Sequence, residues 1–413
     1  MTCSNLDEPS PLAYTVNLTQ EKHILLLCSS DYSKQPRVLR TIEALRNYYQ
    51  ISIASYVLGK SHDNTFIKLS DERPIEFWHF NKPAFIRLPV SLFYRVFKHK
   101  WYSYSKWIES AYWTKNKKQD VKELQKKGFH LVIVHGIDLL PFGAFLTNAG
   151  IPLIFNTHEY YPLEFEQDPT WLKTIGRRNH SILKRYLPKV KTLFTVSEGI
   201  REKYRSEFGK DSIVITNAAP FQELVPGLPD ASKIKLVHHG IANREREIEK
   251  MAELIHFLPN NYEIHFVLTP GDKGYLEEIK EQFSSNGRIK FHEPVPINAL
   301  CAFLNQFDIG YYILPPVNFN TKHALPNKFF EFVQARLCLV FAPLVEIKPL
   351  IDKYEIGVVS VDFSTKEIAN CILGLSVDDI YRCKQNAHKY AREFSSEKNT
   401  DRILSQVKDL IGS

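Results

Sequence analysis

The sequence predicts an α/β protein in which two doubly wound parallel-sheet domains face each other across a cleft and a helical tail follows. Three observations support this fold class. The chain has 413 residues, which is enough for two or three domains. Short apolar runs alternate with helical patterns in both halves, as is typical of parallel strands that are buried on both faces. Residues 217–233 hold three prolines and little periodicity, which predicts a linker between the halves.

The first predicted domain comprises residues 21–216 and contains five apolar runs. The run HILLLC at 23–28 precedes a helical pattern with Val38, Ile42 and Leu45 on one face. Helical stretches separate the remaining runs, which are 51–57, 131–135, 151–156 and 192–196. We expect residues 1–20, ahead of this domain, to be disordered or poorly ordered.

The second predicted domain comprises residues 234–395, where the alternation begins again. Strands are predicted at 235–238, 263–268, 288–291, 309–314, 337–341 and 357–361. Helices are predicted between them at 245–257, 273–283, 297–307, 327–335, 346–354 and 365–374. From Val377 onward the pattern is helical, and we expect the last segment, 396–413, to pack back on the first domain. In such pairs of domains the cleft forms at the C-terminal ends of both sheets.

The composition excludes several classes of protein. Residues 1–8 show neither the basic n-region nor the apolar h-region of a secretory signal, and no run of 18 apolar residues occurs. The six cysteines are scattered and lack metal-ligand spacing. We therefore expect reduced thiols and a cytoplasmic protein.

The formal charge of +7 is concentrated in two short stretches of the first domain. Residues 93–118 and 172–191 contain seven Lys or Arg residues each, and aromatic residues recur at helical spacing in the first stretch. Such a face suits an anionic membrane surface and predicts peripheral contact with the inner face of the plasma membrane. The alternative is a core-facing stripe with a solvated basic back. No recognition motif for nucleic acid accompanies either stretch, so we expect no nucleic-acid partner.

The segment ALPNKFFEF at 324–332 is the sharpest local signal. Pro326 followed by a helical pattern predicts a helix start, where free backbone N–H groups attract an anion. Lys328 and Glu331 are three residues apart and therefore on one face of that helix. The cation suits a diphosphate and the carboxylate suits a ribose diol, and we expect both side chains at the surface of the cleft. The alternative is an exposed ion pair that binds no ligand.

Two further polar segments follow predicted strands. HHGIANRER at 238–246 places Gly240 in a tight turn and Arg246 near the next helix start, where arginine can grip a phosphate through two hydrogen bonds. NTHEYYP at 156–162 places His158 and Glu159 at the C-terminal end of another strand, and Asp138 follows the strand 131–135. His158 is able to move a proton, although a single histidine is more often structural. An Asp after a strand is commonly only a cap or turn residue.

Taken together and in this order, five segments resemble glycosyltransferase family 4, the retaining nucleotide-sugar glycosyltransferases of GT-B fold. The segments are IPLIFNTHEYYP, LFTVSEGIREKYRSEFG, ITNAAPF, LVHHGIANREREIEKM and ALPNKFFEFVQARLCLVF. The resemblance covers nearly the whole chain. It implies two Rossmann-like domains, of which the first binds the acceptor and the second binds the nucleotide sugar.

The resemblance also implies roles for individual residues. Glu331 would hold the ribose, Arg246 and Lys328 would hold the diphosphate, and His158 would face the transferring sugar and the acceptor. The remaining candidates are Asn327, Gly240, Asn217 and His323 on the donor side, and Asp138 and Glu159 on the acceptor side.

The implied reaction transfers a hexose-type sugar from a UDP- or GDP-sugar to a glycan or lipid-linked acceptor, as in the synthesis of cell-surface polysaccharide or lipopolysaccharide. The anomeric configuration is retained through front-face attack, in which the leaving phosphate takes the acceptor proton and Arg246 and Lys328 stabilise its charge. No cofactor or metal is expected, because these cations neutralise the diphosphate and the sequence has no acidic cluster of the DxD type.

Two positions depart from the family pattern. His323 stands where many members have a glutamate eight residues before the ribose glutamate, which we interpret as a change of donor specificity. Arg336 stands where a glycine is usual, so a tight turn there would give Arg336 a positive φ at a cost of roughly 1 kcal/mol.

Two other functions stay open. One is a sugar-nucleotide epimerase of the same fold, which would need a carboxylate pair in the cleft. The other is a non-catalytic scaffold or glycan-binding protein.

Overall fold

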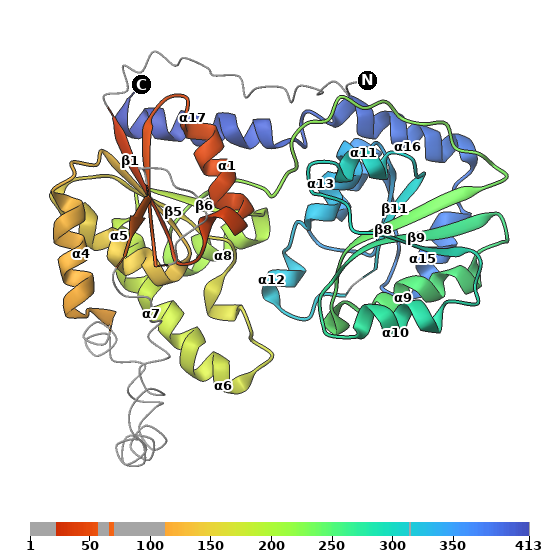
Figure 1. The fold of residues 1–413 in the computed structure, drawn as a ribbon, viewed down its shortest axis with the longest axis horizontal. Coiled ribbons are helices and arrows are strands. Elements are labelled where there is room, and N and C mark those ends of the chain that lie inside the picture. The colour runs from red at the N-terminus through yellow and green to blue at the C-terminus, as the bar shows by residue number, and fades with distance from the viewer. Residues whose placement is uncertain (1–21, 57–65, 70–111, 314, 413) are drawn as a thin grey trace, which may run out of the picture.

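The computed structural model describes residues 22–56, 66–69, 112–313 and 315–412. Figure 1 shows two lobes side by side, each built around one sheet with helices on both of its faces. Every strand pairing in both sheets is parallel. The predicted fold class of two doubly wound α/β domains is therefore confirmed.

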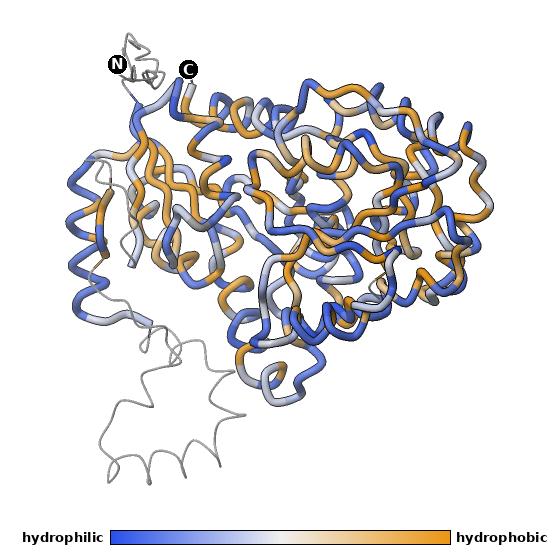
Figure 2. Tube along the Cα trace, turned by 45° about the vertical axis from the view of Figure 1, so that its right-hand side comes forward, coloured by the Kyte–Doolittle hydropathy of each residue, from blue (hydrophilic) through white to orange (hydrophobic). Residues whose placement is uncertain are grey.

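The first sheet has seven strands in the order β3-β2-β1-β4-β5-β6-β7. Strand β1 (His23–Cys28) lies inside this sheet and alternates between two cores, with Leu25 and Leu27 in one and Ile24 and Leu26 in the other. The strands of this sheet are predominantly orange in Figure 2, which marks hydrophobic residues, as expected for strands covered on both faces. The other strands are β2 (Gln50–Ser55), β3 (Phe66–Lys68), β4 (Leu131–His135), β5 (Leu153–Asn156), β6 (Thr192–Thr195) and β7 (Ile213–Val214).

Helices and short turns connect these strands. The helices are α1 (Pro36–Leu45), α4 (Lys115–Gln125), α5 (Leu140–Leu146), α6 (Pro169–Trp171), α7 (Arg177–Tyr186) and α8 (Glu198–Phe208). A π-helical turn, η6 (Leu172–Gly176), joins α6 to α7. The 3-10 turns are η1 (Tyr32–Lys34), η3 (Ile137–Leu139), η4 (Thr147–Ala149), η5 (Tyr161–Leu163) and η7 (Leu187–Lys189).

The second sheet has six strands in the order β10-β9-β8-β11-β12-β13. Its strands are β8 (Ile234–Ala242), β9 (Tyr262–Pro270), β10 (Ile289–His292), β11 (Ile309–Tyr312), β12 (Cys338–Phe341) and β13 (Gly357–Val359). Its helices are α9 (Ile248–Glu253), α10 (Tyr275–Gln282), α11 (Leu300–Leu304), α12 (Phe319–Lys322), α13 (Asn327–Gln334), α14 (Lys348–Tyr354), α15 (Thr365–Leu373) and α16 (Val377–Tyr390). Two 3-10 turns, η8 (Arg244–Arg246) and η9 (Leu254–Phe257), flank α9.

The last helix, α17 (Ser396–Ile411), leaves the second lobe and lies over the first one (Figure 1). Its Ile403 and Val407 are buried in the same core as Val38 and Leu45 of α1. These apolar contacts attach the C-terminus of the chain to the first domain, and α17 therefore ties the two lobes together.

The strand orders fix where a ligand can enter each sheet. In the first sheet the order reverses between β1 and β4, and in the second sheet it reverses between β8 and β11. Ligands of doubly wound folds bind in the crevice outside the carboxyl ends of the strands at such a reversal. The segments after β1, β4, β8 and β11 are thus the places where functional side chains are expected.

Some elements differ from the sequence-based expectations. β3, β7 and α12 were not predicted, because segments of two to four residues are too short to show a periodic pattern. Residues 1–20 and most of the basic stretch 93–118 lie outside the described residues. No helix in the described part of the chain is both long enough and apolar enough to cross a membrane.

Arg336 has the positive φ, 60°, that the sequence predicts for the turn between α13 and β12. Its buried guanidinium donates hydrogen bonds to the carbonyls of Val333 (3.1 Å) and Gln334 (2.7 Å) at the end of α13. It also donates to the carbonyl of Gln222 in the linker (2.6 Å). Hydrogen bonds from a charged group each contribute roughly 1.5–3 kcal/mol, which offsets the backbone strain. Arg336 thereby fixes the linker to the base of α13.

The burial of His135 at the end of β4 predicts how the stability of the protein depends on pH. Burial, and next the charge of Arg37, lower the pKa of His135 from 6.5 to about 3. The folded protein therefore keeps His135 neutral, whereas the unfolded chain takes up a proton as the pH falls through 6.5. We expect His135→Gln to reduce the loss of unfolding free energy on acidification by about 1.4 kcal/mol per pH unit below 6.5. Urea unfolding at several pH values measures this slope.

His256, which is exposed on η9, supplies the matched control. H256Q should keep the slope of the wild type, because an exposed imidazole is solvated in both states. An H135Q slope equal to that of the wild type would contradict the conclusion that His135 is a neutral buried imidazole.

Candidate active site

A pair of cations meets at the carboxyl end of β8 in the second domain. Gly240 has a φ of +143°, and a Cβ at this position would lie 2.8 Å from Nζ of Lys328 and 3.4 Å from Nη1 of Arg246. Only glycine leaves room for both side chains there. Because β8 borders the reversal point of the second sheet, the structure brings Gly240, Lys328 and Arg246 together where a ligand is expected.

Lys328 is held in an environment that disfavours its charge. It lies in the first turn of α13, is 6% exposed, and has its Nζ 5.4 Å from the centre of the Tyr312 ring. Burial, followed by the charge of Arg246, lowers the pKa of Lys328 to about 7, and Glu331 acts in the opposite direction. The sequence predicts this side chain at the surface of the cleft, whereas in the structure it is buried beside Gly240 at the carboxyl end of β8.

Glu331 lies one turn further along α13 and is also buried, at 7% exposure. Its Oε2 is 3.2 Å from Nε2 of His239, but the two groups are not aligned as a hydrogen bond. Burial raises the pKa of Glu331, while the charges of Lys328 and Arg40 oppose this rise. Burial, and next the charge of Lys328, hold the pKa of His239 well below 6.5, so its ring is neutral. Oε2 of Glu331 therefore retains the capacity to accept a hydrogen bond from a ligand hydroxyl.

The other donor-side candidates lie around this group. Asn327 is exposed as the first residue of α13. Asn217 accepts a hydrogen bond from Nε of Arg37 in α1 (2.7 Å), which places it between the two domains. His323 follows α12, and its Nδ1 lies 2.9 Å from Oε1 of Glu346. The same oxygen accepts a hydrogen bond from the backbone N–H of Gly199 in α8, so His323 lies at a contact between the domains.

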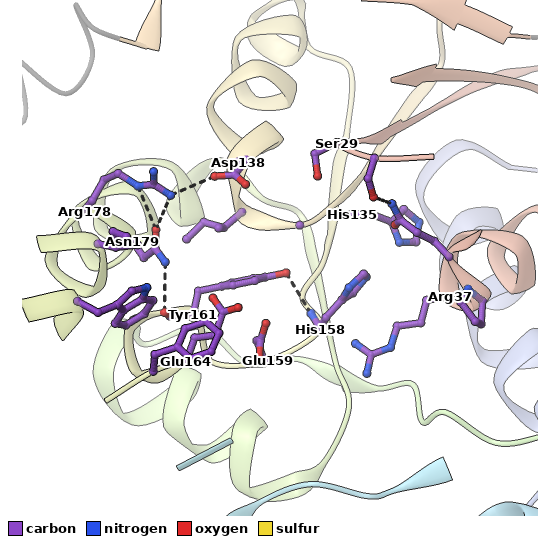
Figure 3. Close-up of a pocket in the computed structure, with 18 residues that line it drawn as sticks. Ser29, Arg37, His135, Asp138, His158, Glu159, Tyr161, Glu164, Arg178 and Asn179 are labelled. Carbon is purple, nitrogen blue, oxygen red and sulfur yellow. Dashed lines mark hydrogen bonds and ion pairs between the residues drawn. The ribbon is translucent and has the colours of Figure 1, made fainter. Parts of the chain in front are cut away.

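A pocket of about 560 Å³ opens at the reversal point of the first sheet (Figure 3). Asp138, His158 and Glu159, the three first-domain candidates, all line it. Ser29 and Ser30 follow β1 and Gly136 follows β4, as the strand order predicts. The remaining lining residues are Gln35, Pro36, Arg37, His135, Ile137, Tyr161, Glu164, Phe165, Trp171, Ile175, Arg178 and Asn179.

Two neutral imidazoles and a buried guanidinium form one side of this pocket. Burial, followed by the charges of Arg37 and His135, holds the pKa of His158 well below 6.5. Nε2 of His158 and Nη1 of Arg37 are buried without a hydrogen-bond partner in the described part of the protein. Buried polar atoms of this kind usually have partners, so these two are available to a bound molecule.

Acidic side chains form the opposite side. The carboxyl groups of Glu159 and Glu164 interact with each other, and both residues are labelled on this side of the pocket in Figure 3. Burial, and next the charge of Glu159, raise the pKa of Glu164 to about 8, so this pair shares a proton near neutral pH. Asp138 is paired with Arg178, whose Nη2 lies 3.1 Å from its Oδ1.

Several of these residues were not identified from the sequence. Arg37 and Arg40 are three residues apart in the helix after the first strand, and His135 is the last residue of a predicted strand. Their positions next to the carboxyl ends of strands could have identified them as candidates. Glu164 and Arg178 had no such signal. They reach the pocket through the turn η5 and the start of α7, which follow no predicted strand directly.

No group of three or more His, Cys, Asp or Glu side chains in the described ranges is arranged to hold a metal ion. The pocket in the first domain and the cation pair in the second are thus the two polar sites at the strand reversals. Two facing α/β domains with a ligand site at the carboxyl edge of each sheet define the GT-B class of fold.

Solved structures of other proteins agree with this class. HepE of Anabaena, in complex with UDP, has a TM-score of 0.66 and 14% identity, covering 94% of this chain and 100% of that chain. The α,α-trehalose 6-phosphate synthase of Burkholderia multivorans has a TM-score of 0.59 and 12% identity, covering 95% and 97%. TarM of S. aureus has a TM-score of 0.56 and 14% identity, covering 72% and 59%. At these identities the similarity shows the fold, which is GT-B.

The sequence itself points to one family. Residues 58–221 match the family model described as Glycosyltransferase Family 4, which confirms the resemblance found in the sequence analysis. The match spans most of the first domain. No curated protein matches the sequence of the chain.

Proposed function

We propose that the protein is a glycosyltransferase that moves a hexose-type sugar from a nucleotide-diphosphate sugar to a hydroxyl group of a glycan or lipid-linked acceptor. The observation that carries this proposal is the Lys328–Arg246 pair at Gly240, with Glu331 one turn along the same helix. A buried lysine and a partly exposed arginine held this close repel each other and favour an anion with two negative groups. A diphosphate meets this requirement, and the open oxygen of Glu331 suits the ribose beside it.

We propose that the nucleotide of the donor is a uridine nucleotide. Solved structures of the similar protein HepE contain UDP and UDP-glucose, which supports a uridine nucleotide here. A GDP-sugar is the other donor that the sequence leaves open. Within the proposal, Asn217, Asn327 and His323 lie on the donor side.

The proposed reaction retains the anomeric configuration through front-face attack. The acceptor oxygen bonds to the anomeric carbon on the face from which the diphosphate departs, and the bond between that carbon and the phosphate oxygen breaks. The proton of the acceptor hydroxyl passes to the leaving phosphate. Arg246 and Lys328 stabilise the negative charge that develops there, so the proposal requires no metal. The neutral ring of His158 offers a hydrogen bond to the transferring sugar or the acceptor from the first domain.

A second candidate function gains support from one observation. The Glu159–Glu164 pair is the kind of carboxylate pair that a sugar-nucleotide epimerase would need in the cleft. Incubating the protein with UDP-glucose in the absence of an acceptor distinguishes the two functions. An epimerised sugar nucleotide would support the epimerase, whereas transfer to an added acceptor supports the glycosyltransferase.

The proposal predicts that the charge of Lys328 is needed for turnover but not for folding. We expect Lys328→Met to lower the turnover of the UDP-sugar about 10²–10³-fold, because it removes a cation that stabilises the leaving phosphate. The melting temperature should be unchanged or higher, since the methionine avoids the desolvation of a buried amine. Release of UDP, measured in buffer containing EDTA, gives the rate.

Lys290, exposed on β10, provides the control, and K290M should behave as the wild type. Glu331→Gln should also lose turnover while keeping the fold. Turnover at the wild-type rate in either K328M or E331Q would remove the second-domain site from the proposal.

The low pKa of Lys328 makes binding of the donor depend on pH. At about pH 8 the free protein holds Lys328 largely neutral, because its pKa is about 7. A bound diphosphate favours the charged amine, so we expect the protein to take up about one proton when UDP binds. Calorimetric titration in two buffers of different ionisation enthalpy measures this uptake. Lys328→Arg, which cannot titrate in this range, should abolish it, and unchanged uptake in K328R would contradict the assignment.

We also propose that the basic surface of the first domain brings the protein to an anionic membrane, where a lipid-linked acceptor of surface polysaccharide would be found. Lys184 and Arg185 are exposed on α7, whereas Arg178 in the same stretch is buried against Asp138. The residues 93–111 lie outside the described residues. This proposal implies a cytoplasmic protein that contacts the membrane peripherally.

Vesicles that contain phosphatidylserine should sediment the protein at low salt and release it at high salt, because salt screens exposed charges. The variant K184E/R185E should sediment less, and K290E, on the second domain, should sediment as the wild type does. Absence of sedimentation of the wild type at low salt would reject membrane contact.

A further inference from the structure

The charges that line the first-domain pocket balance one another. Arg178 is neutralised by Asp138, at 3.1 Å. Arg37 is attracted by Glu159, which belongs to the carboxyl pair that holds a single negative charge while it shares a proton. His135 and His158 are neutral because they are buried. The pocket therefore offers no net charge to a ligand, in contrast to the cation pair of the second domain.

The carboxyl pair is suited to hydroxyl groups. An ionised carboxylate only accepts hydrogen bonds, whereas a protonated carboxyl group donates one and accepts others. Glu159 and Glu164 together thus present both a donor and acceptors within one site. A sugar hydroxyl also donates and accepts, so two neighbouring hydroxyl groups are matched by this pair. A phosphate group has only acceptors near neutral pH and would be repelled by the charge of the pair.

An aromatic pair stands at the rim of the same pocket. Phe165 and Trp171 both line it, and their ring centres are 5.5 Å apart in an edge-on arrangement. Phe165 is 48% exposed, so its ring is accessible to a ligand at this rim. The faces of aromatic rings carry partial negative charge and attract the polarised C–H groups on one face of a sugar ring.

The side of the pocket that carries Glu159 and Glu164 is held in place by contacts with the second domain. In α12 and its cap, Asn318 donates from Nδ2 to the carbonyl of Glu164 (3.1 Å), and Phe319 donates its backbone N–H to the carboxylate of Glu166. Asn320 accepts from the backbone N–H of Tyr160 (2.7 Å) and donates to its carbonyl (3.2 Å). The segment 159–166 is thereby fixed before a ligand enters, which reduces the entropy that binding costs.

We infer that this pocket receives the acceptor as an uncharged sugar ring, with two of its hydroxyl groups on the Glu159–Glu164 pair and one ring face against Phe165 and Trp171. The inference rests on the proposed function and names the chemical class of its acceptor. A phosphorylated sugar, for which the pocket provides no cation without an opposing carboxylate, is the alternative that the test must exclude.

Binding to the protein saturated with UDP tests the inference. The probes are glucose, galactose and N-acetylglucosamine, each compared with its 6-phosphate, and saturation-transfer NMR gives the affinities. We expect at least one neutral sugar to bind more tightly than its phosphate. Glu164→Leu and Trp171→Ala should each lower the affinity for that sugar about tenfold. The loss of one good hydrogen bond or of one stacking contact has an effect of this size. Glu164→Gln should retain most of the affinity, because the amide also donates and accepts.

Two controls separate this inference from the proposed function. Lys173→Ala, on the same helical segment but outside the pocket, should leave the sugar affinity unchanged. UDP affinity, measured by calorimetry, should be unaltered in E164L and W171A, since UDP is expected at the second domain. Failure of the wild type to bind any nucleotide diphosphate or to release UDP from UDP-sugars would defeat the proposed function, whatever sugars bind.

Two outcomes would overturn the inference while leaving the proposed function intact. One is tighter binding of the 6-phosphates than of the neutral sugars. The other is an unchanged sugar affinity in both E164L and W171A.

Discussion

The repulsion between Lys328 and Arg246 is the constraint on which the proposed donor site depends. The amine of Lys328 is buried beside Gly240, close to the partly exposed guanidinium of Arg246, and it loses much of its preference for the charged state. Such an arrangement stores electrostatic free energy that only an anion can release. The rest of the second domain holds it together: β8 supplies the glycine, α13 supplies Lys328 and Glu331, and the turn η8 supplies Arg246.

The two domains are connected by specific polar contacts as well as by the linker. Arg37 of α1 bonds Asn217 at the start of the linker, and Arg336 bonds Gln222 further along it. Glu346 accepts a hydrogen bond from Gly199 and lies beside His323, which joins α8 to the second domain. Because α12 also carries the contacts to Tyr160 and Glu164, a movement of the second domain would disturb the wall of the first-domain pocket. The proposed donor and acceptor sites are therefore linked by contacts between short segments of the two domains.

The fold was largely predictable from the sequence, because strands buried on both faces must be continuous apolar runs and the helices between them must be amphipathic. The cluster around Lys328 was predictable for the same reason, since helix spacing and strand ends follow from local patterns. Its burial was not, because local spacing does not reveal that β8 continues to Ala242 and that its Gly240 lies against the side chain of Lys328. Glu164 and Arg178 were missed because their positions depend on η5, on the π-helical turn η6 and on contacts with α12. The capping box of Asn318 and Thr321 was a local signal for α12 that periodicity alone could not supply.

The two polar sites differ in charge, which would keep the two proposed substrates apart. A nucleotide diphosphate that entered the first-domain pocket would meet Asp138 and the Glu159–Glu164 pair, with Arg178 already neutralised. The same ligand at the second domain would meet Arg246 and Lys328, while Glu331 would remain able to accept hydrogen bonds from hydroxyl groups. The electrostatic free energy of a doubly charged ligand thus favours the second site, and an uncharged ring has no comparable preference for it. The balanced charge of the first-domain pocket and the positive charge of the second-domain site would therefore direct each proposed substrate to its own side of the cleft. Neither site would need to contact the whole of its ligand to achieve this.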